Sequence, residues 1–295
     1  MRGTVLAREG SRFQVLTPSG EVTAVLRGRV KRYEDRALVG DQVILEASAS
    51  GWAIAQVDPR RNVLARREPG RQRERALAAN LDQVFVMAAT RDPEPVPQLV
   101  DRLLVMAEAD DIPAAVIVNK VDLDPGSALV DRMKLAGYEV FPVCVKRGLG
   151  LEPLFARMHT GVSLLTGASG VGKSSLLNAL QPGLALRTAA VSERIGRGRN
   201  TTVTARMIAI EGGGCLVDTP GLSDVGLWGL DPRELVQCFP DLRRSVGQCR
   251  FADCRHISEP GCAVRAAAGV VVPGDRYTSY LAFQEELASL PPDWA

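Results

Sequence analysis

The order of two nucleotide-binding motifs constrains the fold of this chain more than any other feature. Asn119-Lys120-Val121-Asp122 follows the N-K-x-D pattern that reads guanine. It precedes residues 167–174, which form a complete G-x-x-x-x-G-K-[ST] phosphate loop. Ordinary guanine-nucleotide-binding domains carry these two motifs in the opposite order. The sequence therefore predicts a circularly permuted nucleotide-binding domain.

From about residue 76 the chain alternates between apolar runs of strand length and segments with helical spacing. The expected strands cover residues 84–88, 114–118, 140–143, 162–166 and 215–217, and the expected helices cover 96–108, 129–135 and 173–180. Such alternation predicts an α/β fold with a mostly parallel sheet between two layers of helices. Ligands of these sheets bind beyond the carboxyl ends of the strands, which is where both motifs fall.

A phosphate loop requires glycines, because its backbone curls closely around an anion and directs N–H groups at it. Lys173 is expected to reach the β- and γ-phosphates, and Ser174 is expected to bind Mg²⁺. The nucleotide contacts predicted from this motif are Gly167, Ala168, Ser169, Gly170, Val171, Gly172, Lys173, Ser174 and Ser175.

The N-K-x-D segment predicts which base is bound. The carboxylate of Asp122 can accept hydrogen bonds from guanine N1–H and the 2-amino group, and adenine lacks that edge. Asn119 and Lys120 belong to the same predicted site. A looser match to the base-supporting S-A-K loop, for which an ordinary strand end is the alternative, adds Cys144, Val145 and Lys146.

Two weaker signals follow the phosphate loop. Asp218 and Gly221 form a D-x-x-G pattern, in which the carboxylate can hold Mg²⁺ through water and the glycine N–H can contact the γ-phosphate. Before it lies a polar, basic segment, residues 196–202, where a switch loop would place Thr202 or Thr201 on Mg²⁺. Each pattern alone could be an ordinary turn or surface loop, but their position after a phosphate loop favours the functional interpretation.

Four potential metal ligands lie close together near the C-terminus. Cys249, Cys254, His256 and Cys262 give the spacing C-x₄-C-x-H-x₅-C, and the other cysteines are scattered. Such Cys₃His sets commonly bind Zn²⁺ tetrahedrally. Four protein ligands leave no open position, so the sequence predicts one structural rather than catalytic zinc ion.

The N-terminal region has a different pattern. Residues 1–65 contain short apolar strands with turn signals, including Thr17-Pro18-Ser19-Gly20 between two strands, which predicts a small β-barrel. An OB-type barrel fits this pattern, and strand spacing alone fits an SH3-like barrel equally well. The pattern of residues 276–290 predicts a helix near the end of the sequence.

A run of arginines follows the predicted barrel, at Arg60, Arg61, Arg66, Arg67, Arg71, Arg73 and Arg75. Such a run can bind a phosphate backbone, and the alternative is a solvated linker in an arginine-rich chain. The sequence contains no apolar run of membrane-spanning length and no apolar signal core at its N-terminus. We therefore expect a cytoplasmic protein with no membrane partner.

Together these motifs closely resemble one family, the bacterial small ribosomal subunit-dependent GTPases RsgA (YjeQ). The resemblance implies an OB-fold RNA-binding domain over residues 1–72, a circularly permuted GTPase domain over 73–226 and a mainly helical zinc-binding domain over 227–295. It also implies binding to the 30S subunit and its 16S rRNA, late maturation of that subunit, and subunit-stimulated hydrolysis of GTP to GDP. We expect a monomer.

One position departs from the family pattern. The family usually carries a histidine just before the paired threonines, held to act in hydrolysis, and this chain has Asn200 there. Asparagine can orient a water but cannot take a proton at neutral pH. The hypothesis is weak intrinsic hydrolysis with unimpaired GTP binding. A nucleotide-gated RNA-binding factor, an ATP-using enzyme and, with little support, a DNA-binding protein are the alternatives.

Overall fold

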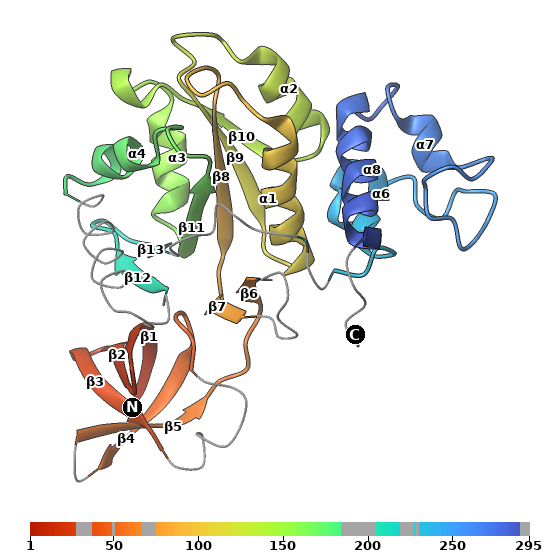
Figure 1. Ribbon diagram of the computed structural model, residues 1–295. Coiled ribbons are helices and arrows are strands. Elements are labelled where there is room, and N and C mark those ends of the chain that lie inside the picture. Colours follow the sequence, from red (N-terminus) through yellow and green to blue (C-terminus); the bar gives the residue numbers. More distant parts are fainter. Residues whose placement is uncertain are drawn as a thin grey trace.

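The computed structural model describes residues 1–27, 37–48, 51–66, 75–183, 205–218, 227 and 230–289. Three units follow one another along the chain (Figure 1). A β-barrel comes first, an α/β unit follows, and a mainly helical unit packs beside the α/β unit at helix α1. Within the described ranges, no helix combines the length and the apolar character needed to cross a membrane.

The barrel closes on itself. Its strands are β1 Arg2–Glu9, β2 Arg12–Thr17, β3 Gly20–Leu26, β4 Gln42–Ser48 and β5 Gly51–Val57. They pair in the order β1-β2-β3-β5-β4, and β4 also pairs with β1. The pairing between β3 and β5 is parallel, and the others are antiparallel. This closed order is OB-like, which decides between the two barrel types that strand spacing left open, and the expected hairpin around residues 17–20 is confirmed.

The α/β unit contains the expected parallel sheet. Its parallel strands are β10 Glu139–Pro142, β9 Ala114–Asn119, β8 Gln83–Ala89, β11 Val162–Gly167 and β13 Cys215–Asp218, and β12 Arg206–Ala209 runs antiparallel to β13. Its helices are α1 Pro97–Ala109, α2 Ser127–Leu135, α3 Leu151–Met158 and α4 Lys173–Leu180. The predicted α/β fold class is confirmed.

Strand β8 shows why this sheet has helices on both faces. All of its residues are buried, and alternate side chains point to opposite sides. Val84 and Val86 lie in a core shared with α1 and α2. Phe85 and Met87 lie in a second core with residues of α3 and α4. Both layers of helices are visible around the sheet in Figure 1.

The barrel and the α/β unit are joined both along the chain and through pairing of their strands. The strands β6 Val63–Arg66 and β7 Arg75–Ala79 form an antiparallel ribbon on either side of the predicted domain boundary at residue 72, which stays a prediction. Ala7 of β1 pairs with Arg206 of β12, so the barrel and the α/β sheet form one continuous eleven-stranded sheet.

Two arginines of the basic run have internal partners. Arg60 donates to the fully buried carboxylate of Asp41 at 2.7 Å, and Arg61 donates to Asp82 at 2.6 Å. The charge of Arg60 is therefore neutralised inside the protein, and Arg61, whose side chain is 61% exposed, pairs at the surface, both at the junction between the barrel and the α/β unit.

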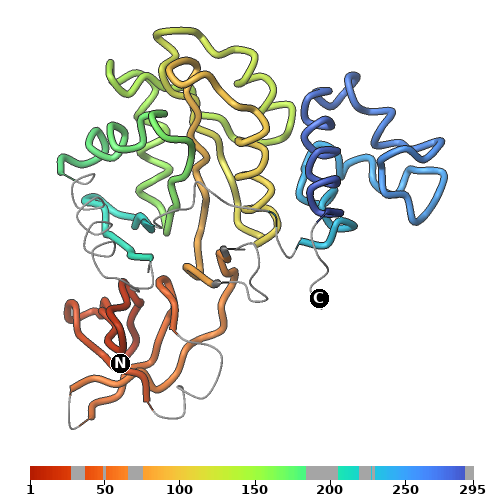
Figure 2. Tube along the Cα trace, viewed as in Figure 1, coloured from red at the N-terminus to blue at the C-terminus, as the bar shows by residue number. Residues whose placement is uncertain are grey.

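The C-terminal unit packs against α1. It contains the short helices η2 Leu235–Cys238, α6 Pro240–Arg243 and α7 Ala263–Ala267, and the long helix α8 Gly274–Ser289. The chain trace in Figure 2 shows α8 beside α1, and Arg102 of α1 forms an ion pair with Glu286 of α8. The helix expected at residues 276–290 is confirmed as α8, except for Leu290, which lies outside the described residues.

A buried ionic network crosses this interface. Arg276 of α8 is fully buried and donates to Asp101 of α1 at 2.7 Å and to Asp241 of α6 at 2.8 Å. Asp101 also accepts two hydrogen bonds from Arg132 of α2, and Arg132 reaches Asp275 at the start of α8. Burial opposes ionisation of Asp101, but Arg132 and Arg276 outweigh it and lower the pKa of this carboxyl group.

Candidate nucleotide and metal sites

The predicted phosphate loop connects β11 to α4. Gly167 ends the strand and has φ +145°, and a Cβ built on it would lie 2.1 Å from the carbonyl oxygen of Met87. Gly172 precedes α4 with φ +106°, and a Cβ there would lie 2.4 Å from Nδ2 of Asn119. Both positions therefore require glycine for backbone conformation and for space.

Lys173 lies within the loop. Its ammonium donates to the carbonyl oxygens of Gly167 at 2.8 Å and Ala168 at 2.7 Å. Partial burial lowers the pKa of Lys173. The loop's own backbone thus holds a cation at the first turn of α4, next to Ser174 and Ser175.

Asn119 joins three segments that the sequence assigned to the nucleotide. Its Nδ2 donates to the carbonyl oxygen of Val171 in the phosphate loop at 2.9 Å. Its Oδ1 accepts from the backbone N–H of Val145 at 3.1 Å. The fold therefore brings the N-K-x-D segment, the phosphate loop and residues 144–146 together, although they are far apart in the sequence.

The backbone of the N-K-x-D segment is also fixed. Lys120 has a positive φ of 64°, and its carbonyl oxygen accepts from the hydroxyl of Thr90 at 2.7 Å. The side chain of Lys120 donates to the carbonyl oxygen of Asp92. Sequence reasoning missed Thr90, because no motif marks the end of β8.

Asp122 lies between a thiol and a guanidinium. A hydrogen bond from Cys144 lowers the pKa of the Asp122 carboxyl, burial opposes that effect, and Arg147 and Lys146 add to it. Nε of Arg147 lies 3.5 Å from Oδ2 of Asp122. The Asp122 side chain is 10% exposed and the Arg147 side chain 65%, so the arginine approaches from solvent. Sequence reasoning missed Arg147, whose only signal was its place directly after Lys146.

Asp218 ends β13 beside the strand that leads into the phosphate loop. Its Oδ2 is buried and has no hydrogen-bond partner among the described residues. Burial raises the pKa of its carboxyl group to about 6. A buried carboxylate oxygen without a partner at this strand end fits a residue that faces a cation, and oxygen ligands are what Mg²⁺ prefers. Gly221, Asn200, Thr201 and Thr202 lie outside the described residues.

The raised pKa of Asp218 predicts a specific pH dependence of stability. The folded state binds this proton more tightly than the unfolded state, so stability falls as pH rises from about 4 to about 6 and then levels off. Asparagine cannot ionise, so Asp218→Asn should not show this decrease in the free energy of unfolding. We expect the decrease in the wild type to be roughly 2–3 kcal/mol at pH 7 without Mg²⁺. Urea unfolding between pH 4 and 7 measures this, with exposed Asp131→Asn as control. An equal pH profile for wild type and Asp218→Asn would contradict the assignment.

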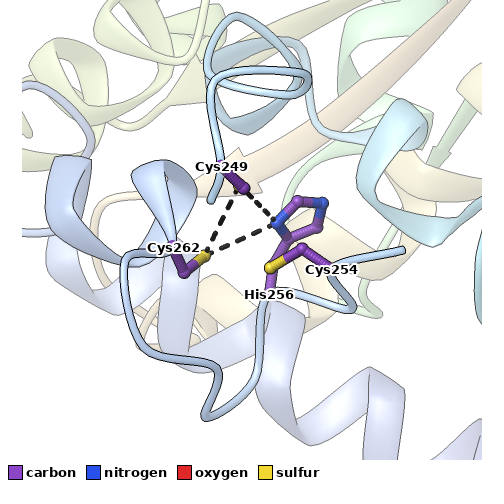
Figure 3. Close-up of side chains that lie close together, drawn as sticks. All are labelled: Cys249, Cys254, His256 and Cys262. Carbon is purple, nitrogen blue, oxygen red and sulfur yellow. Dashed lines mark hydrogen bonds between the residues drawn. The ribbon is translucent and has the colours of Figure 1, made fainter. Parts of the chain in front are cut away.

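The four predicted metal ligands meet in one cluster (Figure 3). Nδ1 of His256 lies 3.5 Å from Sγ of Cys249 and 3.5 Å from Sγ of Cys262, and these two sulfurs are 4.0 Å apart. All four ligand atoms, including that of Cys254, lie within 4.8 Å of one another. A tetrahedral zinc ion with ordinary bond lengths separates sulfurs by about 3.8 Å and sulfur from nitrogen by about 3.5 Å. The cluster therefore has the dimensions that Zn²⁺ requires.

Backbone N–H groups support the sulfurs. Ala263 donates to Sγ of Cys249 at 3.4 Å, and Arg265 donates to Sγ of Cys262 at 3.3 Å. Burial opposes ionisation of Cys249, but the N–H groups of Ala263 and Val264 outweigh it and lower the pKa of this thiol. Such N–H donors stabilise the thiolates that a metal needs.

The loop that carries His256 is held from two sides. The carboxylate of Glu259 accepts from the backbone N–H groups of Arg255 at 2.8 Å and Ile257 at 2.9 Å. From α8, the hydroxyl of Tyr277 donates to the carbonyl oxygen of His256 at 2.8 Å. Sequence reasoning missed both residues: the role of Tyr277 depends on α8 packing against the loop, and that of Glu259 depends on how the loop itself folds back on its carboxylate.

Comparisons with known proteins agree with this arrangement. The family model described as RsgA GTPase matches residues 57–228. The chain is 47% identical to a protein of Gemmatimonas aurantiaca and 38% identical to one of Moorella thermoacetica, each named small ribosomal subunit biogenesis GTPase RsgA. Both alignments cover 97% of this chain and 97% of the relative.

Two solved structures are similar over nearly the whole length. YjeQ from Thermotoga maritima matches with a TM-score of 0.77 and 29% identity, covering 98% of this chain and 99% of that one. YloQ, described as a circularly permuted GTPase, matches with a TM-score of 0.78 and 25% identity, covering 99% of this chain and 96% of that one. The permutation expected from the motif order is thus a property of a solved structural relative.

Proposed function

Because this chain belongs to the RsgA GTPase family, we propose that it is a GTPase that assists biogenesis of the small ribosomal subunit. The observation that carries the proposal is the bridge made by Asn119, which ties a guanine-reading segment after β9 to the phosphate loop after β11, at the carboxyl ends of the two strands that flank β8. The reaction is hydrolysis of GTP to GDP and phosphate.

Each motif has a role in this reaction. The phosphate loop N–H groups and Lys173 bind the β- and γ-phosphates, and Asp122 reads the guanine edge with Asn119 holding its segment in place. Lys120 and residues 144–146 complete the base side of the site, and Gly221 contacts the γ-phosphate. When bound, Mg²⁺ neutralises charge on the phosphates, and Ser174, Asp218 and Thr202 are the residues that would hold it, with Thr201 as the second candidate for the threonine.

Asn200 is the residue that we propose orients the attacking water. Because an amide cannot accept the proton, we expect Asn200→His to raise the single-turnover rate of GTP hydrolysis on the order of 10²-fold. GTP affinity should stay unchanged. Asn200→Gln, which keeps an amide, is the control and should not gain activity. An unchanged rate in Asn200→His removes this residue from the mechanism.

The Cys₃His cluster is proposed to hold one structural Zn²⁺. We expect wild-type protein to contain about one zinc ion per chain and Cys262→Ser to contain almost none. Loss of the ion should also expose the loop around His256 to proteolysis, because metal binding supplies much of the folding energy of such small loops. Cys215→Ser, outside the cluster, is the matched control. Full zinc content in Cys262→Ser would contradict the site.

The contact with RNA, the oligomeric state and the location in the cell are also proposed. We infer that the barrel and the basic residues beside it contact 16S rRNA, that the protein acts as a monomer and that it works in the cytoplasm. Arg60 is not proposed as an RNA contact, because it pairs with the fully buried carboxylate of Asp41, whereas the side chain of Arg61 is 61% exposed and stays a candidate. Electrostatic contacts to rRNA should weaken with added salt.

GTP turnover with and without purified small subunits tests the function. We expect strong stimulation by small subunits, none by large subunits, and binding of guanine but not adenine nucleotides. Guanine binding without stimulation would favour the second candidate, a nucleotide-gated RNA-binding factor, to which Asn200 lends support. Binding of ATP in preference to GTP would overturn both.

A further inference from the structure

We infer that Arg147 is an internal competitor for the guanine base. Its Nε forms an ion pair with Oδ2 of Asp122 at 3.5 Å, and the guanidinium must move away before that carboxylate can read a nucleotide. The inference rests on the proposed function and deepens it, because it names a residue that sets the affinity of the same site.

The position of Arg147 is fixed by its backbone. It is the last residue of the short helix η1 Val145–Arg147, which Gly148 ends with φ +69°. Two backbone hydrogen bonds between Cys144 and Leu149, at 3.0 and 3.1 Å, close the turn that carries it. The start of η1 is held by Asn119, so the backbone of Arg147 keeps its place relative to the base-reading segment while its side chain remains 65% exposed.

The guanidinium of Arg147 and the edge of guanine present similar hydrogen-bond donors. The edge of guanine that Asp122 reads is an N1–H beside an amino group on C2, and with N3 these atoms form a guanidine unit. The side chain of arginine presents the same planar set of N–H donors to a carboxylate. Arg147 therefore offers Asp122 donors of the kind that guanine would bring, at an ion-pair distance of 3.5 Å.

The strength of the ion pair between Arg147 and Asp122 determines how much it slows nucleotide association. Ion pairs with an exposed partner contribute little, so displacement by guanine is easy. If the site is competent only while Arg147 is away, the observed association rate is reduced by the fraction of time in which the pair is formed. Dissociation is unaffected, because the displaced side chain no longer contacts the site.

The test compares arginine variants of the full-length protein by stopped-flow binding of fluorescently labelled GDP. Arg147→Ala should associate roughly two- to fivefold faster than wild type, with an unchanged dissociation rate. Arg91→Ala is the matched control, because Arg91 pairs with exposed Asp124 at 3.4 Å in the same region. Its replacement removes one positive charge, as Arg147→Ala does. That control should bind like wild type or more slowly.

Other outcomes overturn the inference. An unchanged association rate in Arg147→Ala means that the pair does not compete, and faster dissociation means that Arg147 contacts the bound nucleotide instead. If Arg91→Ala increases the association rate of labelled GDP equally, the effect comes from the loss of a positive charge near the site and not from the contact with Asp122. Failure of the wild type to bind labelled GDP would instead refute the proposed function, so the two failures are distinguishable.

Discussion

Replacing Asp122 by asparagine should weaken guanine nucleotide binding on the order of 10⁴-fold and create binding of xanthine nucleotides. The carboxylate accepts from both N1–H and the 2-amino group of guanine. The amide of asparagine has one acceptor and one donor group, so it opposes the 2-amino group but matches the carbonyl oxygen of xanthine at that position. Titration with labelled GDP and labelled xanthosine diphosphate measures the affinities for the two nucleotides and shows whether the preference is reversed.

The neighbouring Asp124 provides the control for this change. It lies in the same loop, pairs with Arg91 and accepts from the backbone N–H of Gly126 at 2.8 Å. Asp124→Asn should keep the preference for guanine. If Asp122→Asn binds GDP as tightly as wild type, the base-reading role of this residue is wrong, whatever the role of the phosphate loop.

Replacing Arg276 by methionine should destabilise the protein by about 3–5 kcal/mol. The change leaves Asp241, which is 2% exposed, without its guanidinium partner, and deprives Asp101 of one of two arginines. A buried carboxylate without a partner is costly because water no longer solvates it. Urea unfolding followed by circular dichroism measures the loss, and hydrogen exchange in α8 locates it.

Two further variants separate this cause from a general loss of packing. Arg102→Met breaks an ion pair between the same helices, but its groups are 21% and 30% exposed, so we expect a loss of about 1 kcal/mol or less. Adding Asp241→Leu to Arg276→Met should recover much of the stability, because the buried carboxylate that has lost its arginine partner is removed. A double variant that loses more than Arg276→Met alone would contradict the explanation.

The sequence predicted the elements whose signals are local. The phosphate loop, the strand that ends at Asn119 and the ligand set that ends at Cys262 each depend on residues that are close together in the chain. The periodicity of α1 and α4 is equally local, because it reflects which side of each helix faces a core. The OB-like order of the barrel could not be decided in this way, since strand spacing does not specify which strands pair.

The missed features depend on elements that meet only in space. Asp101 and Arg276 are 175 positions apart, and neither carries a motif. Arg147 gains its meaning from Asp122, on a neighbouring strand end, and Thr90 from the backbone of Lys120. A polar residue that is buried by another element gives no periodic signal, so only the assembled fold reveals its partner.

The strand pair between Ala7 of β1 and Arg206 of β12 has a mechanical consequence. β12 stands between the segment that contains Thr202 and the strand that ends at Asp218. A force on the barrel is therefore transmitted to β12 through this pair, in addition to the connection through β6 and β7. When the barrel is held by a partner, a displacement of the barrel relative to the α/β unit therefore also displaces β12, which is paired along its length with β13 and its last residue, Asp218.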